Sequence, residues 1–166
     1  FFNVYKLNPT RDLFYAMSHG VNRAKLKKCK TDSRINFLNN LIKKIDNINY
    51  DFYGFENKEP IWGDNFYKAL VNSKMGLNLS RGLPTKYYSS NRIASLMGNG
   101  LLTFIDKKTQ MNDFFNNNEI IFYNGINDLS EKIKFYKKNE KSRIKIARNG
   151  KKKYFQLFNE LKTTKY

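Results

Sequence analysis

Short apolar runs alternate with longer amphipathic stretches along most of the chain, and this alternation restricts the fold more than any other feature of the sequence. A short apolar run bounded by turn residues predicts a buried strand, and an amphipathic stretch predicts a helix that covers the sheet. Strands and helices in alternation are typical of βα units on a parallel sheet. The expected fold class is α/β: a Rossmann-like three-layer domain with a parallel sheet of about five or six strands and a helical C-terminal tail.

Individual elements follow from the same pattern. The predicted strands, each running into a Gly, Asn, Asp or Ser that favours a turn, are 13–18, 50–53, 75–79, 101–105 and 120–123. The predicted helices are 33–45, 65–73 and 92–97, the last ended by Gly98 and Gly100. From Asn127 the pattern is helical almost to the end, with a break expected near Asn139 or Gly150.

Length and composition limit the class of protein. The chain has 166 residues, 40% of them hydrophobic, which supports one folded domain and excludes a wholly disordered chain. Residues 1–12 are expected to be a leading segment or linker, and 13–166 the domain. Apolar runs are far shorter than the roughly 18 residues that a membrane span needs. We therefore expect a cytoplasmic protein, either soluble or peripheral on the inner face of the membrane.

Metal and cofactor sites have little support in the sequence. Cys29 is the only cysteine, so the chain can form no internal disulfide and has no partner thiol for a zinc site. Carboxylates are few and do not recur in a metal-ligand pattern. No metal and no cofactor are expected.

The loop after the first predicted strand is one candidate site. Gly20, Asn22 and Arg23 combine a small-residue turn with a guanidinium that can fork onto phosphate. The loop lacks the GxGxxG and Walker patterns, and Gly20 is equally consistent with an ordinary turn. His19 has no nucleophile at a known spacing, so the catalytic residues stay unknown.

The loop after the third predicted strand is the richer candidate. Two hydroxyls, Ser89 and Ser90, precede a helix whose positive dipole end favours anions. Three cations surround them: Arg81, Lys86 and Arg92. Together these groups predict a phosphate or pyrophosphate site, the alternative being a simple helix cap with solvated cations. Other loops carry residues that suit either a base or sugar contact or ordinary packing: Tyr53, Gly54, Phe55, Trp62 and Asp106.

Residues 92–102, Arg-Ile-Ala-Ser-Leu-Met-Gly-Asn-Gly-Leu-Leu, resemble the arginine, helix, glycine and apolar strand of the C-terminal domain of group-1 glycosyltransferases, of the spore-coat-maturation type. The resemblance extends over about residues 13 to 160. It implies half of a GT-B fold, in which this domain binds a nucleoside diphosphate sugar as substrate and faces an N-terminal acceptor domain of the same protein. It also implies metal-independent transfer of the sugar, in glycan or cell-surface polysaccharide synthesis.

The resemblance also implies roles for individual residues. Arg92, Ser89 and Ser90 would face the donor phosphates, and the loop that holds Gly20, Asn22 and Arg23 would approach the pyrophosphate. Arg81 and Lys86 would neutralise the leaving group. The family commonly has a Glu three residues after the arginine, where it binds the ribose. This sequence has Ser95 at that donor-binding position.

Two other functions remain open. A formal charge of +17 and many aromatic residues fit a nucleic-acid-binding module, but no RRM, KH or zinc-finger pattern appears and most aromatics lie at core positions. The absence of the family's Glu fits a degenerate, non-catalytic domain. Lysine runs at 25–30, 137–138 and 151–153 suit solvated faces or an anionic membrane surface. We expect that this chain alone does not turn over substrate.

Overall fold

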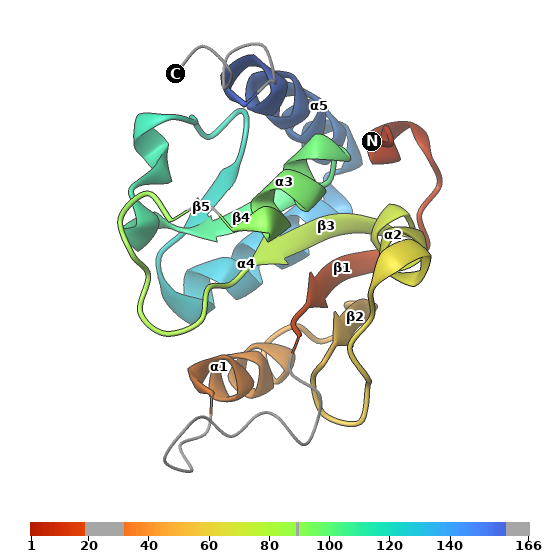
Figure 1. Cartoon of the computed structure of the whole chain (residues 1–166), viewed down its shortest axis with the longest axis vertical. Coiled ribbons are helices and arrows are strands. Elements are labelled where there is room, and N and C mark those ends of the chain that lie inside the picture. Colours follow the sequence, from red (N-terminus) through yellow and green to blue (C-terminus); the bar gives the residue numbers. More distant parts are fainter. Residues whose placement is uncertain (19–31, 89, 159–166) are drawn as a thin grey trace.

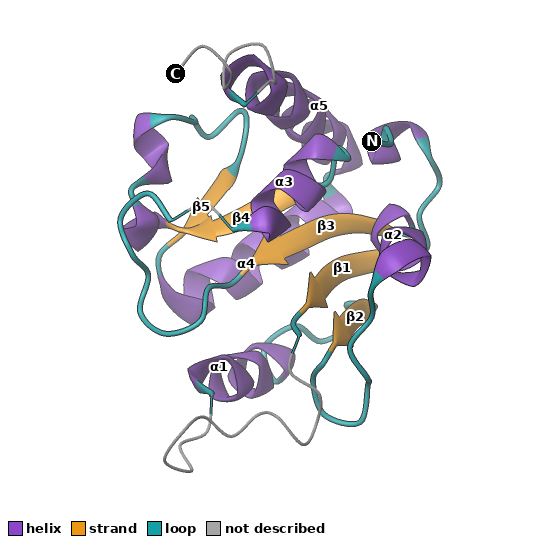
Figure 2. Ribbon diagram, viewed as in Figure 1, coloured by secondary structure: helices purple, strands orange, loops and turns teal. Residues whose placement is uncertain are grey.

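The protein is described by a computed structural model that covers residues 1–18, 32–88 and 90–158. Its centre is a five-stranded parallel sheet with the strand order β2-β1-β3-β4-β5 (Figure 2). The strands are β1 Arg11–Ala16, β2 Tyr50–Tyr53, β3 Ser73–Asn78, β4 Leu102–Asp106 and β5 Ile121–Tyr123. The parallel α/β fold predicted from the alternation of runs is confirmed.

Helices cover both faces of the sheet and make three layers (Figure 1). The helices are α1 Ser33–Ile42, α2 Gly63–Val71, α3 Asn91–Gly98, α4 Gly125–Lys138 and α5 Glu140–Leu157. Short 3-10 turns are η1 Val4–Lys6, η3 Lys107–Thr109 and η4 Met111–Asp113. Apolar residues of α1 and α4 form one core with the sheet, whereas α2 and α3 pack on the opposite face. The helical C-terminal tail predicted from the sequence is α4 and α5.

Several predicted boundaries shift in the structure. β1 begins at Arg11, earlier than expected, because Arg11 pairs with Ser73 in the sheet. Ser73 was predicted to end a helix but opens β3 instead, and its buried hydroxyl donates to the carbonyl of Ala69 on α2. The expected break in the C-terminal tail lies at Asn139, which ends α4 and precedes α5.

Two glycines allow close packing around α3, one against the sheet and one against the N-terminal segment. A Cβ at Gly76 on β3 would overlap the side chain of Leu96, so the missing side chain leaves room for α3 to pack there. Gly100 has φ +79°, the left-handed conformation that follows many helix ends, and a Cβ there would meet the ring of Tyr5. The contact of Gly76 with Leu96 therefore sets how closely α3 packs on β3.

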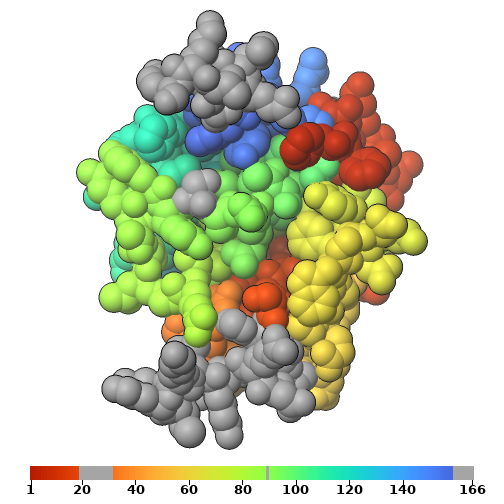
Figure 3. All heavy atoms as spheres, viewed as in Figure 1, coloured from red at the N-terminus to blue at the C-terminus, as the bar shows by residue number. Residues whose placement is uncertain are grey.

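The first residues of the chain pack on the domain rather than lead away from it. Val4 is 1% exposed, and its N–H donates to the carbonyl of Asn99. The ring of Phe1 packs edge-on against Phe155 of α5, with centroids 5.0 Å apart. Figure 3 shows this N-terminal segment beside α5 on the surface of the molecule. Residues expected to form a leading segment are therefore part of the packed structure.

The amino end of the sheet holds a buried carboxylate, Asp12 on β1, which is 1% exposed. Lys74 and Lys137 place their ammonium groups 3.0 and 2.8 Å from it, and the N–H of Asn49 donates to it. Burial alone would raise the pKa of Asp12, but these three donors lower it below the ordinary value. The cluster joins β1 to β3 and α4.

Candidate functional site

The direction in which strands are added reverses between β1 and β3. β2 lies on one side of β1 and β3 on the other, so the connections that leave β1 and β3 diverge to opposite faces. In open parallel sheets, ligands bind beyond the carboxyl ends of the strands at such a reversal. Arg92, in the first turn of α3, extends its side chain to this point.

The guanidinium of Arg92 joins the ends of the two central strands. Its Nε donates to the carbonyl of Ala16 at 3.2 Å, and its Nη1 donates to the carbonyl of Leu79 at 3.0 Å. The same group lies over the ring of Tyr15, 4.9 Å from the centroid. Arg92 is thereby held rigidly at the reversal point by neutral acceptors.

The charge of Arg92 is incompletely compensated. Burial lowers the pKa of Arg92, the neighbouring Tyr15 opposes this, and the positive charge of Arg34 lowers it further. Within the described residues, no carboxylate lies at ion-pair distance from Arg92. A partly buried arginine that meets carbonyls and a second cation, but no carboxylate, has the electrostatic setting of an anion site.

The N-terminus of α3 adds backbone donors beside this arginine. Ser90 occupies the N-cap position, but its hydroxyl makes no capping bond. It donates instead to Oδ1 of Asn78, at 3.0 Å, at the end of β3. The hydroxyl of Ser90 therefore does not cap the first turn of α3, whose N–H groups and dipole favour an anion.

A cleft of about 660 Å³ opens beside these groups; we call it the arginine cleft. It is bounded by Ala16, Ser18, Trp62, Tyr67, Ser90 and Arg92, among others. Trp62 and Tyr67 have 65% and 45% of their surface exposed, which is unusual for such large rings. The cleft thus joins a cation and free helix donors to exposed aromatic faces, a combination that suits a phosphorylated ligand with a planar or ring-shaped group.

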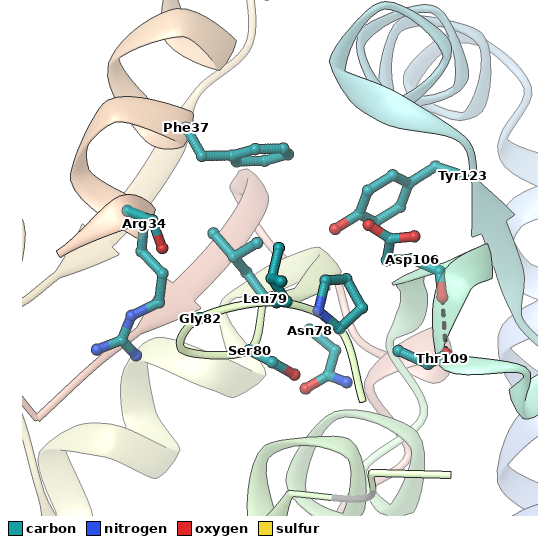
Figure 4. A pocket seen from close by; sticks show the side chains of 12 residues that line it. Arg34, Phe37, Asn78, Leu79, Ser80, Gly82, Asp106, Thr109 and Tyr123 are labelled. Carbon is teal, nitrogen blue, oxygen red and sulfur yellow. Dashed lines mark hydrogen bonds between the residues drawn. The ribbon is translucent and has the colours of Figure 1, made fainter. Parts of the chain in front are cut away.

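A second hollow, of about 350 Å³, lies on the other side of the β3–α3 connection (Figure 4). We call it the tyrosine pocket, after Tyr123 at the end of β5. Its wall also includes Phe37 of α1, Asn78, Leu79 and Asp106. The bond between Asn78 and Ser90 spans the wall between the two hollows.

A buried ion pair lies at the wall of the tyrosine pocket. Asp32, 1% exposed, caps α1 through the N–H of Arg34 and binds the guanidinium of the same residue, with a closest contact of 2.6 Å. Burial would lower the pKa of Arg34, but the bond to Asp32 raises it overall. Arg34 Nη1 also donates to the hydroxyl of Tyr15, at 3.4 Å.

The structure brings together only part of the predicted anion site. Ser90 and Arg92 both line the arginine cleft, whereas Arg81 and Lys86 do not. Arg81 is mostly exposed and lies 4.0 Å from Asp32, and Lys86 lies over the ring of Tyr87. Tyr87 donates its N–H to the carbonyl of Thr109, which holds this loop toward η3.

Other candidate residues divide between the two hollows, the core and the part of the chain that is not described. Ser95, which stands in place of the family's Glu, turns its hydroxyl back onto the carbonyl of Asn91. Trp62 lines the arginine cleft and Asp106 the tyrosine pocket, whereas Phe55 is buried in the core. Six further residues named in the sequence analysis lie outside the described residues: His19, Gly20, Asn22, Arg23, Cys29 and Ser89.

The sequence analysis did not predict several polar residues that lie at these two hollows. Asn78 and Tyr123 stand at the ends of predicted strands, where a polar group in an apolar run is a recognisable signal. The Asp32–Arg34 pair carried no such signal, because only the fold shows that both residues are buried.

Two features are absent from the described residues. No three His, Cys, Asp or Glu side chains in residues 1–18, 32–88 and 90–158 lie together as a metal ion would require. Over the same ranges, no helix combines the length and apolar character needed to cross a bilayer.

Comparison with known families decides the broad identity of the chain. The family described as Glycosyl transferase-like matches residues 27–159, which is most of the sequence. The chain belongs to this glycosyltransferase-like family. The resemblance to group-1 glycosyltransferases inferred from residues 92–102 is thereby confirmed.

Comparison with solved structures supports the fold of this glycosyltransferase-like domain. The structure titled "Crystal Structure of TarM" superposes with a TM-score of 0.67 at 14% sequence identity. The alignment covers 96% of this chain and 35% of that one, so this domain spans about a third of its structural relative. None of the curated proteins matches the sequence.

Proposed function

We propose that this domain binds the nucleoside diphosphate sugar of a glycosyltransferase, with the diphosphate at Arg92 and at the N-terminus of α3. The observation that carries the proposal is the guanidinium of Arg92, held at the strand reversal point with no carboxylate partner among the described residues. A bound diphosphate would supply the missing negative charge through charge-assisted hydrogen bonds. The family match makes a nucleotide sugar the natural source of that diphosphate.

The aromatic residues of the arginine cleft suit the rest of the donor. Trp62 and Tyr67 offer exposed rings within the same cleft as Arg92, so a base or sugar can stack there while the phosphates meet the cation. The family's ribose-binding carboxylate is replaced by Ser95, whose hydroxyl bonds to its own helix. We infer that donor affinity depends more on the phosphates and the rings than on ribose.

We infer that Arg92 and the N-terminus of α3 also assist the transfer of the sugar. When the bond between the sugar and the diphosphate breaks, negative charge accumulates on the departing phosphate oxygens. Arg92 and the backbone N–H groups of α3 are fixed before that charge develops, which is the condition for electrostatic stabilisation. We propose that these groups support transfer without a metal ion. The acceptor and any general base come from a preceding domain of the longer protein.

The test uses calorimetry to measure how tightly a panel of nucleoside diphosphates binds. The intact chain is compared with matched arginine and lysine variants. Arg92→Ala should weaken binding about 10- to 150-fold, which corresponds to roughly 1.5–3 kcal/mol for a charge-assisted bond. Arg81→Ala should weaken it less, because Arg81 lies outside the cleft beside Asp32. Lys152→Ala, which removes a cation from α5, is the control and should have little effect.

Added EDTA and salt distinguish this cleft from a metal-dependent site and from an exposed basic surface. Binding should persist in EDTA if no metal is needed. It should also keep most of its strength at high salt, since contacts in a defined cleft are screened less than those of an exposed basic surface. Equal losses in all three variants, with a steep salt dependence, would instead favour the nucleic-acid-binding alternative.

A further inference from the structure

The outward side of α5 carries a stripe of exposed cations. Residues three or four positions apart share one side of a helix, and this spacing joins four exposed basic residues: Lys141, Lys145, Arg148 and Lys152. The opposite side of the helix, with Ile146 and Ala147, is buried in the core. We call the four basic residues the cationic face of α5.

No carboxylate of the described residues balances this charge. α5 contains no Asp or Glu after Glu140, and Glu140 pairs with the buried Arg143. Within residues 1–18, 32–88 and 90–158, none of the four basic residues of the cationic face lies at ion-pair distance from a carboxylate. Lys74 and Lys137, by contrast, both bind Asp12. The cationic face therefore presents its positive charge to partners outside the domain.

Exposed apolar side chains lie beside the cationic face. Phe2 and Leu7 have 49% and 47% of their surface exposed. Lys151 of α5 holds this N-terminal segment by donating to the carbonyl of Phe2 and to Oδ1 of Asn3. Leu7 also lines a small hollow together with Ile144 of α5. The surface thus combines cations with apolar groups that reach solvent.

A hollow of about 770 Å³ follows the cationic face, and its two aromatic rings are already packed within the domain. The ring of Phe155 packs edge-on against Phe1, and the ring of Tyr5 lies against Gly100. Single-stranded nucleic acids bind largely by stacking bases on free aromatic rings. This surface is therefore better suited to an anionic partner that also has an apolar layer.

We propose that the cationic face and the N-terminal segment beside it bind an anionic lipid surface. The basic residues attract the headgroups, and Phe2 and Leu7 enter the boundary between headgroups and acyl chains. In Figure 1, α5 and the N-terminus lie together at one end of the molecule, well away from the tip of β1 that borders the arginine cleft. The cleft stays open when α5 faces the lipid, and lipid binding does not depend on the donor site.

The test is flotation of the intact chain with lipid vesicles. The chain should bind vesicles that contain phosphatidylglycerol, bind pure phosphatidylcholine vesicles far more weakly, and lose most of its binding at high salt. The double variant Lys145→Gln, Lys152→Gln should weaken binding about 10- to 30-fold, since each lysine near an anionic surface contributes about 5-fold. The double variant Lys43→Gln, Lys44→Gln, at the exposed end of α1, is the control of equal charge and should bind like the unaltered chain.

Two further variants separate a lipid surface from other anions. Leu7→Ser should weaken vesicle binding about 2- to 10-fold, because it removes an apolar side chain from the interface. It should not weaken the binding of a single-stranded oligonucleotide. Arg92→Ala, which alters only the arginine cleft, should bind vesicles like the unaltered chain, so failure of the donor site would not imitate failure of this one. Thermal unfolding checks that each variant is folded.

Three results would overturn the proposal. The first is no vesicle binding even at low salt. The second is an equal loss in the α5 and α1 double variants, which would reduce the effect to net charge. The third is an oligonucleotide that binds more tightly than the vesicles, together with a Leu7→Ser variant whose vesicle binding is unchanged; this would assign the cationic face to nucleic acid.

Discussion

The two ends of the central sheet differ in how completely their buried polar groups are partnered. At the amino end, Asp12 is surrounded by Lys74, Lys137 and the N–H of Asn49, so its charge and its lone pairs are satisfied within the domain. At the carboxyl end, Arg92 donates to neutral carbonyls and has no carboxylate partner among the described residues. A closed network stabilises a fold, whereas groups left incomplete at a strand reversal are available to a ligand.

This difference is visible along single strands. β3 begins with Ser73, whose hydroxyl is bonded to α2, and ends with Asn78, whose amide nitrogen has no partner within residues 1–18, 32–88 and 90–158. β1 begins next to the Asp12 cluster and ends at Ala16, whose carbonyl holds Arg92. The same strands therefore end in satisfied polar groups on one side and in incompletely partnered ones on the other.

The largest effect that tests this contrast is expected from Asp12→Asn. The substitution removes a buried charge from two ammonium groups, and the free energy of unfolding should fall by about 2–3 kcal/mol, less than for a fully enclosed pair because both lysines reach solvent. Nucleoside diphosphate affinity should not change. Urea denaturation measures the first quantity, and Asp46→Asn, which breaks the exposed pair of Asp46 with Lys134, is a control expected to change little.

The pH dependence of stability tests whether Asp12 is held by its two lysines. The bonds to Asp12 lower its folded pKa below the ordinary value of 3.8, so its stabilising effect is fully present above pH 3.8 and is lost as the pH falls through the lowered value. The difference in unfolding free energy between the unaltered chain and Asp12→Asn should therefore shrink on acidification below pH 3.8. Denaturation curves in which this difference is constant down to the acid limit would show that Asp12 is not held by these lysines.

The smallest predicted effect comes from Ser95→Glu at the carboxyl end. A carboxylate at this position, which the related glycosyltransferases commonly have, should strengthen nucleoside diphosphate binding about 2- to 10-fold through hydrogen bonds to the ribose. Binding of inorganic pyrophosphate, which has no ribose, should not improve. Calorimetry with both ligands measures the difference, and Ser95→Gln separates the contribution of charge from that of hydrogen bonding.

Local patterns were sufficient to predict most of the fold. The apolar runs that became β2 and β5 are short and bounded by turn residues, and Ser90 before Arg92 correctly indicated a helix start. Ser73 was misassigned because it follows an amphipathic stretch directly. Its place in β3 depends on pairing with Arg11, a contact that no local pattern contains.

The proximity of candidate residues was predicted only where local sequence determines geometry. Ser90 and Arg92 share one helix turn, so their proximity follows from the sequence, and the structure places both at the arginine cleft. Arg81 and Lys86 are close to them in sequence but not in that cleft, because the N–H of Tyr87 anchors their loop to Thr109. Contacts such as Asn78 with Ser90 depend on how β3 and α3 pack, which residue spacing alone does not specify.

The central claim is that the carboxyl end of the sheet, and not the basic surface of the domain, binds the diphosphate. Backbone NMR of the labelled chain during titration with a nucleoside diphosphate measures this directly, because amides near the ligand shift first. The account predicts saturable shifts at Ala16, Ser18 and Asn91 to Ile93, with the lysine-rich surface of α5 unaffected. Shifts that instead gather at Lys145, Lys151 and Lys152, and that disappear with added salt, would contradict it.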